Sequence, residues 1–202
     1  MSEKNYSTAD IQAVANGIRK QILGVALKTG GCYLAQACSS AEIIASLYTR
    51  VMNLGPSVGS WEPIPFPGVP GPDNMDYQRG SSYNGAPAPD KDRFFVSCCH
   101  YASVIYAALA ETGRISPDCM DKFNVDGWEH GNDRCGALPG FENTAGCSAR
   151  PSRSQAARLM PASAAATPAS AMFCSVTVSC RKVRPGSAFR QPVTTSWIIS
   201  SL

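Results

Sequence analysis

The chain has 202 residues and a mass of 21.4 kDa, and 44% of its residues are hydrophobic and 16% charged. These values exclude a fibrous chain, a wholly disordered chain and a disulfide-stapled miniprotein. The net charge of +3 divides unevenly: residues 1–146 hold all 15 acidic residues and carry −4, whereas residues 147–202 hold no acidic residue and carry +7. We therefore treat residues 1–146 and 147–202 as two different kinds of sequence.

The chain contains no stretch of about twenty consecutive apolar residues, so we expect no membrane span. Its first ten residues, MSEKNYSTAD, lack the apolar run of a signal peptide. The nine cysteines are an odd number and include no CxxC pair. In a chain without an export signal this usage predicts reduced thiols and a cytoplasmic location.

Two helices are expected near the N-terminus. In residues 8–29 the apolar side chains recur at intervals of three and four, which is the period of one helix face, and the pattern stops at a pair of glycines. Ser39 is then expected to cap a second helix, with Glu42 bonding back to the cap amide, and this helix runs to about residue 52. Residues 55–90 hold eight prolines and six glycines without periodicity, and they are expected to form an irregular segment.

Residues 92–97 form a short strand candidate, because two aromatic side chains and a valine suit a buried, pleated surface. The strand leads through Cys98 and Cys99 to His100, and a helix is expected over residues 102–111. Ser116 is expected to cap a further helix that opens with Pro117 and ends near residue 123, before a loop over residues 124–146. A strand that delivers a histidine to the start of a helix is typical of a site in an open α/β sheet.

Three ordered segments resemble transketolases. KDRFFVSCCHYASVIYAALAETGRIS is similar to the family's DRFxxSxGHxxxxxYAALAExG segment, TGGCYLAQACSSAEIIASLY to GxGHPGGSLSxADIxAxLY, and PGFENTAG to PGxExxTG. Their order and spacing over residues 8–146 are those of the N-terminal, pyrophosphate-binding half. The segments VPGPDNMDY and SYNG fit a bacterial branch in which that half is a separate subunit.

The resemblance implies an α/β thiamine diphosphate-binding fold, which here is incomplete: helices plus the first strand of a parallel sheet, followed by a disordered tail over residues 147–202. It also implies thiamine diphosphate and Mg²⁺ as cofactors and the transfer of a two-carbon ketol unit between sugar phosphates. A C-terminal, pyrimidine-binding transketolase subunit and self-association are the partners that it implies.

The same resemblance implies roles for four residues. His100 matches the GH histidine, which faces cofactor and substrate, and His130 is a candidate for a second family histidine, so both are expected to be catalytic. Gly146 matches the glycine whose backbone the diphosphate approaches closely. Glu142 matches the motif glutamate, for which cofactor binding and a purely structural acceptor role both remain open.

The chain also departs from the family pattern. Tyr33 stands where the family has a substrate-contacting histidine, and Cys98 and Cys99 replace the pair, often Lys-Gly, that precedes the GH histidine. The sugar specificity of the family is therefore not carried over to this chain.

Two alternatives stay open. A non-catalytic thiol- or zinc-binding protein with a basic arm would use ligand types found at Cys98, Cys99, His100, His130 and Cys135, but adjacent cysteines suit one tetrahedral site poorly. The +7 tail as a nucleic-acid-binding arm is weaker, because it has little aromatic interleaving and no basic cluster longer than residues 181–184. We expect no nucleic-acid partner.

The tail after Gly146 lacks the family's SLGQ, GDGE and KLDNL segments. If its codons are read one base earlier, the codon that straddles Met172 and Phe173 must encode Val, the next must encode Leu, and the one that straddles Trp197 and Ile198 must encode Asp. With permitted codons elsewhere, residues 173–184 read VLFGDGELQEGQ and residues 196–201 read KLDNLI. This pattern predicts a one-base frameshift near Gly146 or Cys147.

The shift has a chemical consequence. In the family, the GDG aspartate and a later asparagine hold the divalent ion that bridges the cofactor diphosphate. Residues 176–178 of this chain read Val-Thr-Val, which offers no carboxylate, and the asparagine is expected beyond Leu202. We therefore expect the chain as written to be inactive.

Overall fold

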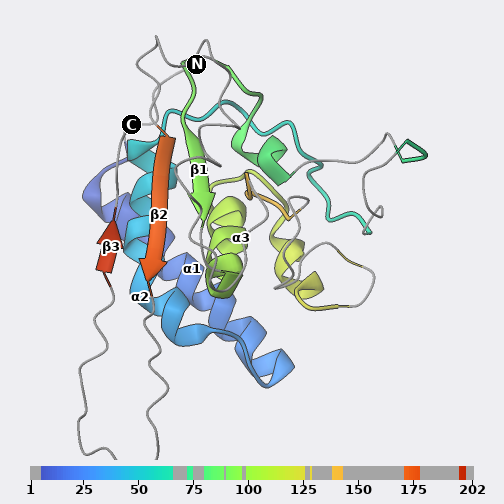
Figure 1. Cartoon of the computed structure of the whole chain (residues 1–202). Helices are drawn as coiled ribbons and strands as arrows, with labels where there is room; N and C mark the ends of the chain where they lie inside the picture. The colour runs from blue at the N-terminus through green and yellow to red at the C-terminus, as the bar shows by residue number, and fades with distance from the viewer. Residues whose placement is uncertain are drawn as a thin grey trace, which may run out of the picture.

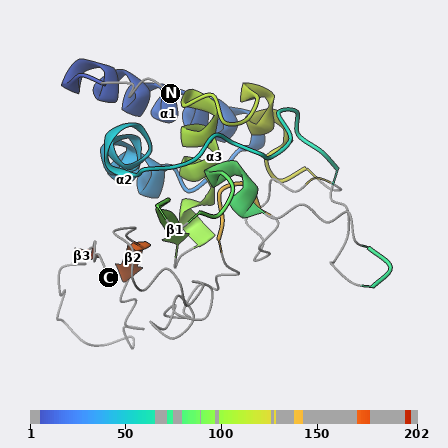
Figure 2. The same ribbon diagram turned by 90° about the horizontal axis from the view of Figure 1, so that it is seen from above.

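The fold was analysed in a computed structural model of the whole chain. The structure describes residues 6–65, 72–74, 80–88, 90–96, 99–125, 128, 138–142, 171–177 and 196–198, with only the backbone of the last two segments. Three helices and one strand make up the ordered N-terminal part: α1 (Thr8–Thr29), α2 (Leu34–Ser46), β1 (Arg93–Val96) and α3 (Ala102–Glu111). Figures 1 and 2 show β1 on one side of α2 and α3, with α1 packed on their other side.

Helix α1 confirms the expected residues 8–29. Ser7 and Asp10 form a capping box at its start, because the Ser7 hydroxyl accepts from the Asp10 amide and the Asp10 carboxylate accepts from the Ser7 amide. Gly30 ends the helix in a left-handed conformation with a φ of 73°. The buried face consists of Ala15, Ile18, Ile22 and Val25. These residues lie on the helix face that the apolar pattern predicted.

Helix α2 begins earlier than the sequence pattern suggests, so the prediction of Ser39 as its cap is wrong. The residue before its first turn is Tyr33, which makes no side-chain cap bond, and Ser39 lies inside the helix, where its hydroxyl donates to the Gln36 carbonyl oxygen at 3.0 Å. Leu34 and the alanines that follow it are good helix formers, which explains the early start. From Leu47 to Val51 the helix widens into a π-helical turn, η1.

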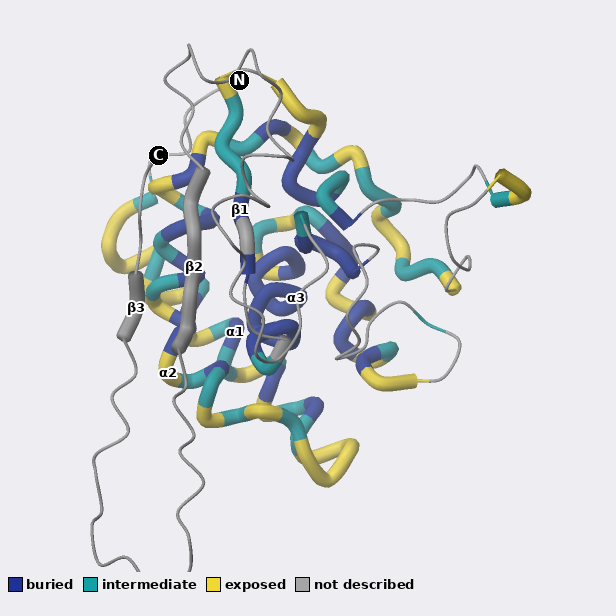
Figure 3. Tube along the Cα trace, in the orientation of Figure 1, coloured by how far each residue is buried: buried dark blue, intermediate teal, exposed yellow. Residues whose placement is uncertain are grey.

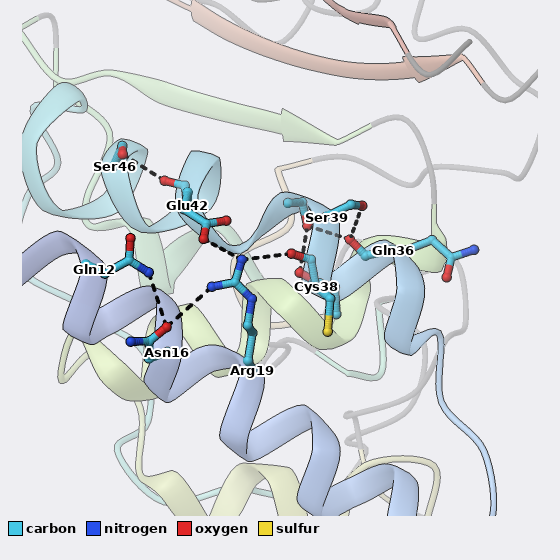
Figure 4. Close-up of polar contacts among 10 residues, drawn as sticks. Gln12, Asn16, Arg19, Gln36, Cys38, Ser39, Glu42 and Ser46 are labelled. Atoms are coloured by element: carbon cyan, nitrogen blue, oxygen red, sulfur yellow. Dashed lines mark hydrogen bonds and ion pairs between the residues drawn. The ribbon is translucent and has the colours of Figure 1, made fainter. Parts of the chain in front are cut away.

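Glu42, which was expected to bond back to that cap, instead joins α2 to α1. Figure 4 shows the guanidinium of Arg19 between the two helices, where it pairs with the Glu42 carboxylate and donates to the Cys38 carbonyl oxygen at 3.0 Å. The hydrogen bond from Arg19 holds the pKa of Glu42 below its ordinary value. The side chains of Arg19 and Glu42 are partly exposed, so their ion pair contributes little to the stability of the fold. Its main effect is to orient α2 on α1.

Strand β1 and helix α3 confirm the expected strand and helix. Every residue of α3 from Ala102 to Ala110 is buried, which Figure 3 shows as the darkest helix of the molecule. A helix that is apolar all round must be covered on all sides. Here α1, α2 and β1 lie around α3, which makes it the centre of the core.

Three 3-10 helices, η2, η3 (Cys99–Tyr101) and η4, lie among the described residues of the N-terminal part. Residues Pro117–Lys122 form η4, so the helix predicted after Ser116 is present but is a 3-10 rather than an α-helix, and Ser116 caps it through the Asp118 amide at 3.4 Å. Residues Gly80–Asn84 form η2 within the segment expected to be irregular. The loop expected over residues 124–146 is described only at 124–125, 128 and 138–142.

Strands β2 (Ala171–Thr177) and β3 (Ser196–Ile198) extend the sheet in the order β1-β2-β3. β1 and β2 are parallel, with Arg93 opposite Ala171, and β2 and β3 are antiparallel. The disorder expected for residues 147–202 stays a prediction, because most of that tail lies outside the described residues. The fold is thus consistent with an incomplete α/β fold.

None of the helices within the described ranges has the length and apolar content that a membrane span requires.

Candidate functional site

The expected site begins directly after β1. The 3-10 turn η3 (Cys99–Tyr101) carries His100 between the end of the strand and the start of α3. Tyr33, which immediately precedes α2, lies against His100, with ring centroids 4.5 Å apart and ring planes at 87°. The structure therefore brings together the expected histidine and the tyrosine that departs from the family pattern, and an edge-to-face contact of this kind fixes the orientation of both rings.

Two of the described cysteines, Cys32 and Cys119, are weak nucleophiles. Burial raises the pKa of the Cys32 thiol, and a hydrogen bond with Ser103 opposes that rise only in part. Burial also raises the pKa of Cys119, below α3, to about 12. Because the thiolate is the reactive form, these two cysteines are expected to stay protonated and inert at neutral pH.

A second polar group lies around the turn formed by residues 138–142. Asn84, at the end of η2, donates through Nδ2 to the Gly140 carbonyl oxygen at 3.0 Å and to Glu142 Oε1 at 3.0 Å. Its Oδ1 accepts from the hydroxyl of Tyr48, in the π-helical turn η1, at 3.2 Å. The Gly140 amide donates to the Gly80 carbonyl oxygen at 2.9 Å, so the turn is tied to η2 twice.

Glu142 is a buried carboxylate with two polar partners in this group. Its side chain is 7% exposed, and Oε1 lies 3.5 Å from Nη1 of Arg93, which is 14% exposed and also donates to the Gly85 carbonyl oxygen. Burial raises the pKa of Glu142, while Arg93 and the Asn84 hydrogen bond oppose the rise. Burial outweighs both partners, so ionisation of this carboxyl group costs more free energy in the folded chain than in water.

The raised pKa of Glu142 predicts a pH-dependent effect of Glu142→Gln. Because the native state binds this proton more tightly than the unfolded state does, the contribution of Glu142 to stability is complete below pH 4.5 and is lost as pH rises through the raised pKa. We expect the variant to gain stability relative to the parent chain as pH rises from about 4.5 towards 7. Urea unfolding across this range measures it, and a difference that does not change with pH would contradict the assignment.

The structure describes two of the four expected site residues. His100 and Glu142 lie on different elements, one after β1 and one in the turn that packs on α3, while His130 and Gly146 lie outside the described residues. Asn84, Arg93 and Tyr48 were not predicted. Arg93 belongs to the quoted DRF segment and Asn84 to the quoted SYNG segment, but the resemblance implied no role for either residue.

The metal-site alternative is only partly covered by the structure. Among the described residues, no three side chains of His, Cys, Asp or Glu lie together as they would around a metal ion. Of the five candidate zinc ligands, however, Cys98, His130 and Cys135 lie outside that part of the chain, as does the side chain of Cys99. The zinc prediction therefore stays a prediction.

Comparison with known proteins bears on the family of the chain. No protein-family model matches the chain. The 6-deoxy-6-sulfo-D-fructose transketolase subunit SqwG of Clostridium sp. (strain MSTE9) is 28% identical over 127 residues, which are 63% of this chain and 35% of that relative. The chain thus matches about a third of the relative's length. This distant match supports a transketolase-like family for the chain.

Proposed function

We propose that the chain derives from the N-terminal, pyrophosphate-binding subunit of a transketolase-like enzyme that transfers a two-carbon ketol unit between sugar phosphates. The observation that carries the proposal is the 127-residue match to a transketolase subunit. The three ordered motifs of residues 8–146 support it, and so does the placement of His100 between a strand and a buried helix.

Within this proposal, thiamine diphosphate supplies the carbanion chemistry when it is bound. His100 and His130 are the proposed contacts to cofactor and substrate, and Gly146 is the proposed point of close approach to the diphosphate. Glu142 is proposed to contribute to the cofactor site, with a purely structural acceptor role as the alternative. A C-terminal, pyrimidine-binding subunit would complete the enzyme, because the family takes the glutamate that activates the aminopyrimidine from that partner.

The residues present do not fit the Mg²⁺-bridged diphosphate. The Val-Thr-Val of residues 176–178 offers no carboxylate, and no cluster of potential metal ligands occurs in the described ranges. Mg²⁺ in such sites is held by carboxylate and carbonyl oxygens together with the phosphates. We therefore propose that the chain as written binds the cofactor weakly and does not turn over.

The proposed frameshift would explain why the metal-binding carboxylate is missing. Reading residues 173–184 one base earlier places the aspartate of GDG at position 177, the last residue of β2. Sequencing the coding DNA across codons 146 and 147 tests the proposal, with one inserted or deleted base as the expected result. An intact reading frame in both the genomic DNA and the transcript would exclude it.

A calorimetric titration separates the proposed function from the zinc-binding alternative. The full chain is titrated with thiamine diphosphate and Mg²⁺ and then, in a separate sample, with Zn²⁺, and thermal unfolding is followed in parallel. We expect neither micromolar cofactor binding nor stoichiometric zinc. Micromolar cofactor binding would overturn the proposed loss of function, and one zinc per chain would favour the thiol- or zinc-binding protein.

The same titration of protein expressed from the frame-corrected gene provides the matched comparison. We expect Mg²⁺-dependent binding of thiamine diphosphate to appear only after correction, because the GDG carboxylate is then present. If the corrected protein folds but fails to bind thiamine diphosphate even in the presence of the C-terminal, pyrimidine-binding subunit, the assignment to a pyrophosphate-binding subunit is wrong.

A further inference from the structure

The side chain of Asn84 is buried, and both its nitrogen and its oxygen have hydrogen-bond partners. It is 1% exposed. Its two amide protons have two acceptors, the Gly140 carbonyl oxygen and Glu142 Oε1, while its oxygen accepts from the Tyr48 hydroxyl. The opposite orientation of the amide would point its oxygen at two acceptors, so the contacts fix the orientation.

Only a side chain of this kind serves all three partners. A carboxylate of the same length accepts from Tyr48 but has no proton to donate, and alanine neither accepts nor donates. The partners belong to separate parts of the chain, the π-helical turn η1 and the turn of residues 138–142. Asn84 therefore joins two segments that share no regular backbone pairing.

The group that gains most from Asn84 is the Glu142 carboxylate. Its other polar partner, Arg93, lies at 3.5 Å and divides its donors between Glu142 and the Gly85 carbonyl oxygen. Without Asn84, a buried carboxylate would keep only this longer contact. A buried charge that loses a hydrogen bond is costly, and an exposed position of residues 138–142 would relieve that cost.

We propose that Asn84 is the positioning residue that sets where Glu142 and residues 138–142 lie. This role of Asn84 deepens the proposed function and rests on it, because residues 138–142 lead into the segment that is proposed to receive the diphosphate. The placement itself needs no cofactor. Every measurement below is made without thiamine diphosphate, so a failed cofactor titration leaves its result intact.

Cleavage after Glu142 by glutamyl endopeptidase measures this placement directly. A protease cleaves a buried site only after the segment opens locally, so the rate reports the open population. A short glutamyl peptide substrate added to the same sample normalises the protease activity. We expect Asn84→Ala to raise the normalised rate by at least about tenfold, because the hydrogen bonds lost exceed the ~1.4 kcal/mol that a factor of ten represents.

Asn84→Asp adds a pH profile that a general packing defect would not give. At neutral pH the new carboxylate faces Glu142 without a proton between them, and like charges repel. As pH falls, the two carboxyl groups can share one proton and restore a hydrogen bond. Around the pair lie the cation Arg93 on β1, the Tyr48 hydroxyl on η1, and Arg114 after α3. We expect the normalised rate to fall several-fold between about pH 7.8 and 5.

The controls separate local opening from general unfolding. Asn16→Ala makes the same change on the exposed surface of α1 and is expected to leave the rate after Glu142 unchanged. Glu42, on α2, reports opening of the helical core. Should Asn84→Ala fail to fold, Tyr48→Phe removes only the hydroxyl that Asn84 accepts from, and about a threefold rise is expected. A parent-like rate after Glu142 in the folded variants, or an equal rise after Glu42, overturns the proposal.

Discussion

Replacing Gly140 with alanine is expected to lower the free energy of unfolding by about 2–4 kcal/mol. Gly140 has a φ of 83°, a left-handed conformation that disfavours every residue with a Cβ. A Cβ there would lie 2.8 Å from Cγ2 of Ile105 and 3.0 Å from Cδ1 of Leu109, both on the buried face of α3. The turn must then move away from the core helix, and urea denaturation at neutral pH measures the loss.

Gly24→Ala is the matched control and is expected to have the opposite sign. Gly24 lies inside α1, and a Cβ at this position would meet nothing within 4 Å. Alanine in a helix interior is favoured over glycine by about 0.5–1 kcal/mol, so this variant should be more stable than the parent chain. A tolerated Gly140→Ala, or losses of equal size at both positions, would show that the turn does not pack on α3 as described.

Truncating Phe94 on β1 to alanine is expected to cost about 3–5 kcal/mol of stability. Phe94 is 0% exposed, and its ring meets that of Tyr48 edge to face at a centroid distance of 5.7 Å. The change removes a large apolar side chain and leaves a cavity between the strand and the helices. Chemical denaturation gives the stability, and the near-ultraviolet circular dichroism of the tyrosines reports the lost ring contact.

Leu27→Ala provides the comparison for that variant. Leu27 is also a large apolar residue, but it is 78% exposed on α1. An exposed side chain leaves no cavity, so its truncation should change stability by no more than about 0.5 kcal/mol. If Phe94→Ala were as mild as Leu27→Ala, β1 would not be anchored in the core.

The elements with strong periodicity could be predicted from the sequence. The bounds of α1 and α3 agree with the expected residues because a continuous apolar pattern defines each helix and a glycine follows each end. The cap of α2 could not be predicted correctly, because Ser39 and Glu42 also satisfy a capping pattern when they lie inside a helix. The partner that decides between the two, Arg19, is 23 residues away from Glu42 in the sequence.

The candidate site was predictable only in part. The position of His100 follows from the strand and helix around it, and its neighbour Tyr33 was identified by the resemblance alone. The contacts of Asn84 could not be predicted, because they join residues 36 to 58 positions apart across an irregular segment. Local patterns carry no information about such contacts, which depend on how the helices pack.

The position in the sequence of the residues around Glu142 has a consequence for biosynthesis. Asn84 and Arg93, which contact Glu142, and Tyr48, which contacts Asn84, all precede residue 143. The residues of α3 on which the turn packs precede it too. These segments leave the ribosome before the basic tail is complete, and N-terminal parts of a chain generally fold first during synthesis. The nascent chain can therefore form these contacts around Glu142 before residues 147–202 are complete, whatever sequence follows residue 146.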